Sequence, residues 1–438
     1  MKRLISLSLV TFVFSIFPVA QAQSPETDPI TRPRSVEAAK SGKRAQDLLR
    51  SHAQQTQEPA RKSEGAKPTD KAPPVVTQKK DEANQREEVN GSSNRLSPNR
   101  IRTRINEAER LLKSRPTPTA LTTPALDYVT LAAFLPESSQ IHLIRINKQN
   151  FLMRGSEIQA TTSLGLPVSV RVVRANGVNT AVTIFDARNR SLSPLVVEFP
   201  IERRGVFREM AYYTSAHPAL LSSDLTKAGQ AYVNSMVELA AKRLRDKGVP
   251  IAQNLIEIAK RLCLVEHVDH DRFRNENRIT LFEEIYSLYA LNELDTYRYS
   301  VSSAGAGGMV QMIPWTYALM RQRYPGVGLN PDFVLGMRNH GNALEAMLLY
   351  MRDTANDLLG NEDVQAALAA KQITTSELMS AGYNSNAAKL PGYIRRAGAD
   401  WRALIPRETQ MYLQIYQSLD VLMKGKENHA HKIQVRQR

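Results

Sequence analysis

A glutamate at the end of one predicted helix is the first residue whose surroundings suggest chemistry. Residues 279–293 have a helical pattern in which Leu281, Ile285 and Leu288 recur on one face, and Glu293 closes the run. A carboxylate beside an apolar face loses part of its hydration, which raises its pKa and suits it to general acid catalysis. The same pattern also fits a solvated glutamate at a helix end, so the neighbouring residues must decide between the two.

A run of small residues follows this glutamate and leads into another predicted helix. Residues 302–313 read Ser-Ser-Ala-Gly-Ala-Gly-Gly-Met-Val-Gln-Met-Ile, and Pro314 suits the first position of a helix. Glycine and alanine let a backbone or a ligand approach closely. Gln311 adds a neutral donor and acceptor. The apolar end of the run favours an ordered, packed segment over a flexible loop.

These two segments resemble the signature of the soluble lytic transglycosylases, goose-lysozyme-like enzymes that cleave peptidoglycan. The family's catalytic glutamate precedes the first alanine of its Ala-Gly-Ala stretch by about eleven positions, and the same count back from Ala304 reaches Glu293. Residues 381–386 resemble the family's sugar-contacting Ala-Tyr-Asn segment, and residues 405–412 resemble its closing helix. Residues 330–350 resemble the intervening stretch loosely. Four segments in the family's order support the resemblance.

The chain also departs from the family pattern. Leu294 stands where the family usually has serine, Met309-Val310 replaces Leu-Met, and Ser385-Asn386 replaces Ala-Gly. These changes bear on substrate preference and rate more than on the class of reaction. The retained positions are Glu293, Gln311, Tyr383 and Asn384.

The resemblance implies a mechanism with one carboxylate. Most glycosidases place two across the bond, whereas the nearest acid here, Asp295, is two positions from Glu293 and would face elsewhere on a helix. Protonated Glu293 would donate to the oxygen between N-acetylmuramic acid and N-acetylglucosamine. It would then take the proton of the muramoyl C6 hydroxyl as this attacks C1, leaving a 1,6-anhydromuramoyl end. The expected substrate-binding residues are Ser303, Met309, Gln311, Tyr383 and Asn384.

Two other functions fit the same residues. A hydrolytic muramidase would let water attack, and a non-catalytic cell-wall binding or scaffold protein would only grip the glycan. We expect no cofactor and no metal, since one cysteine, Cys263, cannot build a cysteine-rich metal site. Residues 266–271 are rich in Glu, His and Asp, but they lack the His-Glu-x-x-His arrangement.

The N-terminal part of the chain predicts export. Residues 1–22 have a basic start, an apolar run and an Ala-Gln-Ala end, which are typical of a cleaved signal peptide. The mature protein is therefore expected in the periplasm or outside the cell, with no transmembrane segment after cleavage. Residues 23–120 have no aromatic side chain and are rich in polar residues and proline, so they predict a disordered basic linker. Residues 101–113 are periodic enough for a short helix.

The rest of the chain predicts an α+β multidomain protein. Residues 121–203 contain short β-branched and aliphatic runs between turn residues, which predict a β-rich accessory domain of five to seven strands. Four such runs are at 141–146, 168–173, 180–185 and 195–201. Residues 204–423 have helical periodicity, and the resemblance implies an all-α lysozyme-like domain with its core at 266–423. The periodicity predicts helices at 224–247, from there to about 265, and at 279–293, 314–324, 339–358, 364–369 and 408–423. Residues 424–438 predict a basic disordered tail.

The net charge of +15 lies mostly at the two ends of the chain. Residues 121–423 hold 31 basic against 29 acidic residues. A protein that binds nucleic acid usually carries a basic stripe on its fold, so we expect no nucleic-acid partner. The expected partners are peptidoglycan glycan strands and an envelope protein bound through the β domain.

Overall fold

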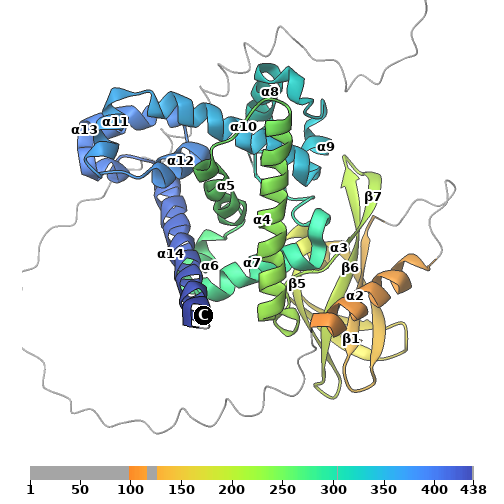
Figure 1. Ribbon diagram of the computed structural model, residues 1–438. Helices are drawn as coiled ribbons and strands as arrows, with labels where there is room; N and C mark the ends of the chain where they lie inside the picture. The colour runs from red at the N-terminus through yellow and green to blue at the C-terminus, as the bar shows by residue number, and fades with distance from the viewer. Residues whose placement is uncertain (1–97, 116–125, 303, 437–438) are drawn as a thin grey trace, which may run out of the picture. The chain divides into compact units, whose positions relative to one another are not determined.

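The computed structural model describes the backbone of residues 98–115, 126–302 and 304–436. The predicted signal peptide and residues 23–97 of the predicted linker lie outside this part. The described chain confirms a mixed α+β architecture, in which a curled antiparallel sheet is followed by many helices (Figure 1).

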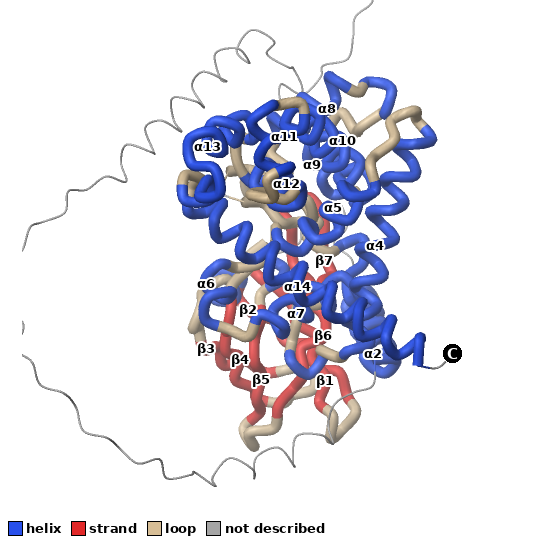
Figure 2. The backbone as a smooth tube through the Cα atoms, turned by 60° about the vertical axis from the view of Figure 1, so that its left-hand side comes forward, coloured by secondary structure: helices blue, strands red, loops and turns tan. Residues whose placement is uncertain are grey.

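The sheet has seven strands in the order β2-β1-β6-β5-β4-β3, and β7 pairs with β6. All pairs are antiparallel, and the long strand β6 joins β1, β5 and β7, so it is the spine of the sheet (Figure 2). The strands are β1 (Tyr128–Leu135), β2 (Gln140–Asn147), β3 (Glu157–Thr161), β4 (Pro167–Arg174), β5 (Ala181–Asp186), β6 (Ser191–Arg203) and β7 (Val206–Tyr213).

Strand β7 lies where the sequence predicted the start of the helical part. Four predicted runs coincide with β2, β4, β5 and β6, but the sheet continues past residue 203. Arg204 and Gly205 both have positive φ, 55° and 73°, which is the backbone of a two-residue hairpin turn. The turn folds β7 back on β6, so that Arg203 pairs with Val206 and Val197 with Tyr213.

A helix covers one part of the sheet, so the prediction of a linker up to residue 120 is wrong at its C-terminal end. Helix α2 (Pro98–Lys113) contains the short helix that residues 101–113 predicted. Ile101, Ala108 and Leu112 are fully buried, because this spacing puts them on one face of the helix. They pack with Phe134 and Val196 of the sheet. The last residues of the predicted linker therefore belong to the folded part.

The helices after the sheet match the predicted ones closely. Those predicted at 224–247, up to 265, 279–293, 314–324, 339–358, 364–369 and 408–423 are all present. Helix α14 is longer than predicted: it runs to Arg436, because residues 424–436 contain no proline and a single glycine. The helices are α3 (Lys148–Phe151), α4 (Ser223–Asp246), α5 (Gln253–Val265), α6 (His270–Asn275), α7 (Arg278–Asn292), α8 (Pro314–Arg323), α9 (Phe333–Arg338), α10 (His340–Leu359), α11 (Glu362–Ala369), α12 (Thr375–Asn384), α13 (Leu390–Ala397) and α14 (Arg407–Arg436).

One hydrophobic core joins the sheet to the helices. Ile144 and Val170 of the sheet belong to the same buried cluster as Val233 of α4, Leu262 of α5 and Leu288 of α7. Helices α4 and α7 lie beside the sheet (Figures 1 and 2), and their backbones touch at Gly229 of α4, where an added Cβ would lie 1.7 Å from the Tyr286 carbonyl oxygen. The position of α7, and of the residue that follows it, is thus fixed by both neighbours.

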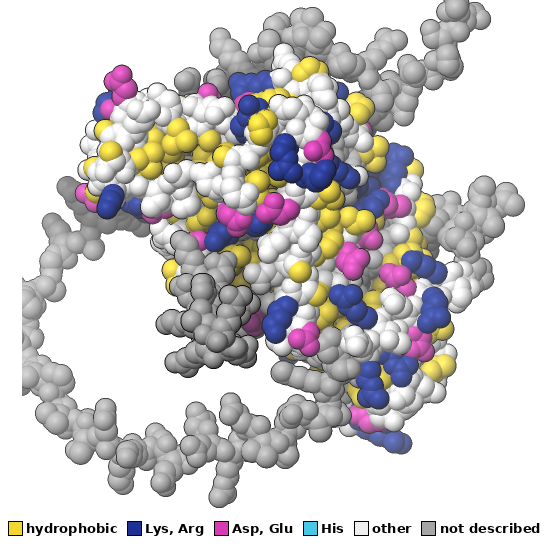
Figure 3. All heavy atoms as spheres, in the orientation of Figure 1, with side chains coloured by type: hydrophobic (Ala, Val, Ile, Leu, Met, Phe, Trp, Pro, Cys, Tyr) yellow, Lys and Arg dark blue, Asp and Glu magenta, His cyan; other side chains and the backbone are white. Residues whose placement is uncertain are grey.

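The surface of the described part is mixed in charge. On the face shown in Figure 3, positive and negative side chains are interspersed over the folded elements. Every helix that the structure describes is too short or too polar to cross a membrane.

Candidate active site

Glu293 lies at the point where α7 ends. Its backbone has φ 46° and ψ −117°, a conformation that non-glycine residues rarely adopt, and a 3-10 turn (Glu293–Asp295) begins there. The side chain is exposed, whereas the sequence predicted partial desolvation by the apolar face of the helix; the irregular backbone turns it off that face. Within the described residues its carboxylate forms no hydrogen bond and no ion pair. It is therefore available to a ligand.

The end of α7 is hydrogen-bonded to Thr214, the residue that follows β7. The Asn292 side-chain amide donates to the Thr214 carbonyl oxygen at 2.9 Å, and the Thr214 N–H donates back to Asn292 Oδ1 at 2.8 Å. Thr296 Oγ1 donates to the Leu288 carbonyl oxygen at 3.1 Å. These bonds hold both sides of Glu293 and maintain its strained backbone.

A buried histidine supports the same turn from α10. His340 Nε2 donates to the Thr296 carbonyl oxygen at 2.8 Å, which leaves Nδ1 to accept from the Tyr232 hydroxyl at 2.9 Å. Burial lowers the pKa of His340 to about 4, so the ring is neutral at pH 7. Burial, then the charge of Glu293, raises the pKa of Tyr232 above its usual value.

The other carboxylates of this region are held by arginines. Asp295 pairs with Arg298 at 3.3 Å. Glu209 pairs with Arg298 at 3.4 Å and with Arg338. Among these acids of the described chain, Glu293 alone has no cationic partner.

The glycine-rich segment forms a compact loop next to this turn. Gly307 makes β-bridges with Val301 and Met312, and Gly308 has φ 68°. An added Cβ on Gly308 would lie 2.2 Å from the Met337 carbonyl oxygen. Glycine is thus needed both for the left-handed backbone and for the close approach to α9.

Gln311 stabilises this loop through hydrogen bonds of its side chain. Its backbone also has positive φ, 45°, and its side-chain amide donates to the Gly308 carbonyl oxygen at 2.7 Å and to Ser300 Oγ at 3.2 Å. The side chain is half-buried. Glu293, Tyr297 and Gln311 are three of the seven non-glycine residues with positive φ that the structure describes, and all three fall in this short region. Such strain concentrates at functional sites.

The structure brings some of the other predicted site residues together. The Tyr383 hydroxyl donates to the Val310 carbonyl oxygen at 2.6 Å, which joins α12 to the loop. Asn384 is the last residue of α12 and is half-buried. Met309 is fully buried in the core and so supports the loop by packing instead of lining a cleft. Ser303 lies outside the described residues. Among the described residues, the side chains of Gln311, Tyr383 and Asn384 form no hydrogen bond with Glu293, and the chain from Thr296 to Ser300 links the Glu293 turn to the loop.

Exposed apolar side chains surround the turn and the loop. Leu294 is 59% exposed, Val301 71% and Trp315 66%. Val301 is bridged to the loop, and Trp315 lies in the first turn of α8, directly after it. Apolar and aromatic surface of this kind suits the faces of sugar rings.

A half-buried glutamate, Glu266, precedes the histidine that contacts the loop. Glu266, at the end of α5, accepts a hydrogen bond from the Tyr412 hydroxyl of α14 at 2.5 Å, and burial raises the pKa of Glu266 to about 8. Next to it, His267 donates from Nε2 to the Met309 carbonyl oxygen at 2.9 Å and stacks on Tyr297 with ring centroids 3.4 Å apart. Within the stretch at 266–271, His267 therefore positions the loop, whereas Glu266 bonds to α14 and Asp269 caps α6. Within the described residues no group of three His, Cys, Asp or Glu side chains is placed to hold a metal ion.

The raised pKa of Glu266 predicts a stability that falls as the pH rises from 4.5 to about 8. Folding favours the protonated form of Glu266. The contribution of Glu266 to the free energy of unfolding is therefore complete below the ordinary pKa of 4.5 and is lost as the pH rises through about 8. We expect the Tm of the wild-type protein to fall by several degrees between about pH 5 and about pH 8.5. Glu266→Gln keeps the acceptor for Tyr412 but cannot ionise, so its Tm should change less. Thermal melts of both proteins across this range test the prediction, and parallel curves would contradict it.

Sequence reasoning missed several residues that build this site. Tyr232 and His340 lie far from the loop in sequence and carry no motif, so only the packing of α4 against α7 and α10 brings them together. His267 was noted only as part of the stretch rich in Glu, His and Asp at 266–271.

A comparison of the chain with family models, with characterised proteins and with solved structures finds no match in any of the three. A function must therefore be argued from the residues themselves.

Proposed function

We propose that this protein is a peptidoglycan lytic transglycosylase with Glu293 as its catalytic residue. The observation that carries the proposal is an exposed carboxylate without a partner in the described chain, on a strained turn beside a tightly built loop. The resemblance of residues 293–314 and of the later segments to that family supports the same reading. A lysozyme-like fold for the helical part belongs to the proposal.

In the proposed reaction Glu293 donates one proton and later accepts another. Glu293 gives its proton to the glycosidic oxygen as the bond from C1 of N-acetylmuramic acid to that oxygen breaks. The C6 hydroxyl oxygen of the same sugar then bonds to C1, and its proton passes to the Glu293 carboxylate. The atoms balance without water, and the sugar ends as a 1,6-anhydro ring. Because Asp295 is paired with Arg298, one free carboxylate suits a reaction in which the substrate supplies the nucleophile.

The glycan strand would lie over the turn and the loop. Trp315 and Val301 offer apolar faces, while Gln311, Tyr383, Asn384 and Ser303 are the proposed polar contacts or supports. A bound strand would cover the Glu293 side chain and exclude water from the reacting atoms.

The cellular setting is part of the same proposal. We infer a periplasmic or secreted enzyme that acts on glycan strands without a cofactor, with the sheet as the surface for an envelope protein. Nucleic acid is not among the proposed partners.

Mass spectrometry of digested peptidoglycan tests the proposal. The mature protein is incubated with purified sacculi, and the products are compared with those of Glu293→Gln. We expect 1,6-anhydromuramoyl ends that disappear in the variant. Reducing ends would show a hydrolytic muramidase instead. Sacculus binding without any product would indicate a wall-binding scaffold.

A further inference from the structure

Strand β7 and the residue after it are bonded to the chain on both sides of Glu293. On the near side, the pair of hydrogen bonds between Asn292 and the backbone of Thr214 joins the end of α7 to the end of β7. On the far side, Glu209 of β7 pairs with Arg298 at 3.4 Å. The turn that carries Glu293 is thus held from one strand at two points.

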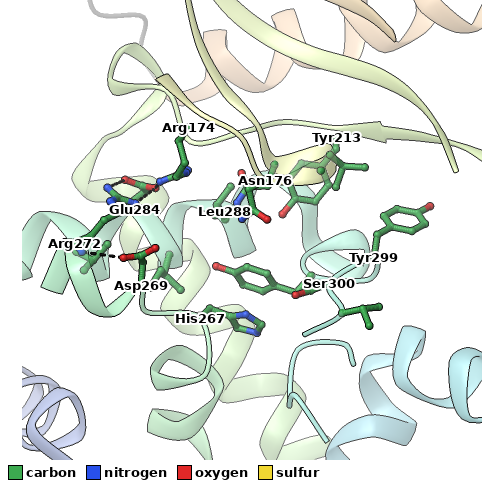
Figure 4. Close-up of a pocket in the computed structure, with 17 residues that line it drawn as sticks. Arg174, Asn176, Tyr213, His267, Asp269, Arg272, Glu284, Leu288, Tyr299 and Ser300 are labelled. Atoms are coloured by element: carbon green, nitrogen blue, oxygen red, sulfur yellow. Dashed lines mark hydrogen bonds and ion pairs between the residues drawn. The ribbon is translucent and has the colours of Figure 1, made fainter. Parts of the chain in front are cut away.

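Packing alone does not fix this turn to the sheet. A cavity of about 330 Å³ lies between them, and Tyr213 of β7, Leu288 of α7 and Tyr299 line it (Figure 4). Since no side chain of the described chain fills this space, packing cannot by itself set the position of the turn. The polar contacts are made by neighbours of the lining residues, because Thr214 follows Tyr213 and Arg298 precedes Tyr299. These contacts therefore determine how the turn lies against β7.

The backbone that these contacts hold is strained at Glu293. Its φ of 46° with ψ of −117° carries little penalty for glycine but a clear one for any residue with a Cβ. Such a conformation persists only where its surroundings enforce it. Asn292 is the residue next to Glu293, and its partner Thr214 is only 2% exposed, so water cannot readily replace their hydrogen bonds. Among the contacts of this turn, the Asn292 pair is the one closest in the chain to the strained residue.

We propose that β7 is part of the active site and that Asn292 is a positioning residue, which keeps Glu293 in its strained conformation. Glu209 assists from the other side of the turn. It also pairs with Arg338, the last residue of α9, and Gly308 of the glycine-rich loop packs against the same helix. Strand β7 thus sets the turn and the loop relative to each other. The strain does not depend on the proposed function, whereas its benefit to catalysis rests on that function.

A comparison of glycine with alanine at residue 293 measures the strain. Glycine adopts this backbone without the penalty, so Glu293→Gly should melt about 3 °C or more above Glu293→Ala in the mature protein. When Asn292→Ala is added to both, the turn should relax and the advantage of glycine should disappear. Lys371 is the matched control, because it has φ 56° beyond the end of α11 and is exposed. The difference between Lys371→Gly and Lys371→Ala should be the same with and without Asn292→Ala.

Kinetics with purified sacculi test the effect on catalysis. Asn292→Ala should lower kcat about tenfold or more and change KM less than about twofold, because the glycan still binds while the acid is misplaced. An enzyme that is merely destabilised would keep its kcat well below its Tm.

Glu209→Gln is the second variant, and it decides the question if Asn292→Ala does not fold. It keeps the size of the side chain and removes the charge that holds Arg298 and Arg338. The advantage of glycine at residue 293 should shrink in this background, and kcat should fall about threefold or more.

The possible results separate this proposal from the proposed function. An unchanged advantage of glycine in both Asn292→Ala and Glu209→Gln would overturn the proposal, whether or not the wild type cleaves glycan. A lost advantage with an unchanged kcat would overturn the role of Asn292 in positioning the acid. If the wild type releases no fragments, the proposed function fails, and the melting comparison still decides whether Asn292 enforces the conformation of Glu293.

Discussion

Glu293→Gln should lower the rate of glycan cleavage by about 10²–10⁴-fold, the range that a general acid contributes. The substitution keeps the size of the side chain and removes the proton that the leaving oxygen needs. Because the side chain is exposed and has no partner in the described chain, the Tm should stay within about 2 °C of the wild type. Release of soluble fragments from sacculi measures the rate, and a thermal melt confirms the fold.

Asp295→Asn is the matched control for this prediction. Asp295 lies on the same turn, and its carboxylate is held by Arg298 at 3.3 Å. With one catalytic carboxylate, Asp295→Asn should retain most of the activity. An equal loss in both variants would indicate a pair of carboxylates and a hydrolytic reaction. Full activity in Glu293→Gln would refute the catalytic assignment.

Gly229→Ala should destabilise the protein strongly. The added Cβ would lie 1.7 Å from the Tyr286 carbonyl oxygen, so α4 and α7 would have to move apart. No flexible side chain can move to relieve overpacking against a backbone atom. We therefore expect the free energy of unfolding to fall by about 3 kcal/mol and the Tm by about 10 °C. Since α7 ends at Glu293, the remaining folded protein should also cleave glycan more slowly.

Gly392→Ala provides the contrast. Gly392 lies in α13, and an added Cβ there would meet no atom within 4 Å. Alanine is the better helix former, so this variant should be unchanged or slightly more stable. Chemical denaturation of both variants and the wild type measures the difference. Equal stability of Gly229→Ala and Gly392→Ala would contradict the close packing of α4 on α7.

The helices were largely predictable because their signals are local. Pro314 marks the start of α8, and the spacing of Leu281, Ile285 and Leu288 marks the buried face of α7. Strand β7 was not predictable in the same way, since residues 206–213 gain their strand conformation by pairing with β6 across the turn at 204–205.

The candidate site was predictable in its residue types but not in its geometry. The spacing between Glu293 and the glycine-rich segment is visible in the sequence, whereas the exposure of Glu293 results from a backbone conformation that no propensity favours. Asn179 illustrates the remaining limit. A single asparagine in a β-rich segment has no motif, so its burial, with Oδ1 left without a partner in the described chain, is recognised only in the folded structure.

The core shared by sheet and helices has a consequence for how this chain can be recombined. Phe199 and Tyr213 of the sheet pack in one cluster with Val237 of α4 and Leu264 of α5. A fragment that begins at residue 204 would expose this apolar surface and would also part β7 from β6. The helical part is thus one half of a structure and not a portable module, and a gene fusion that joined it to another accessory domain would have to bring a sheet with the same apolar face.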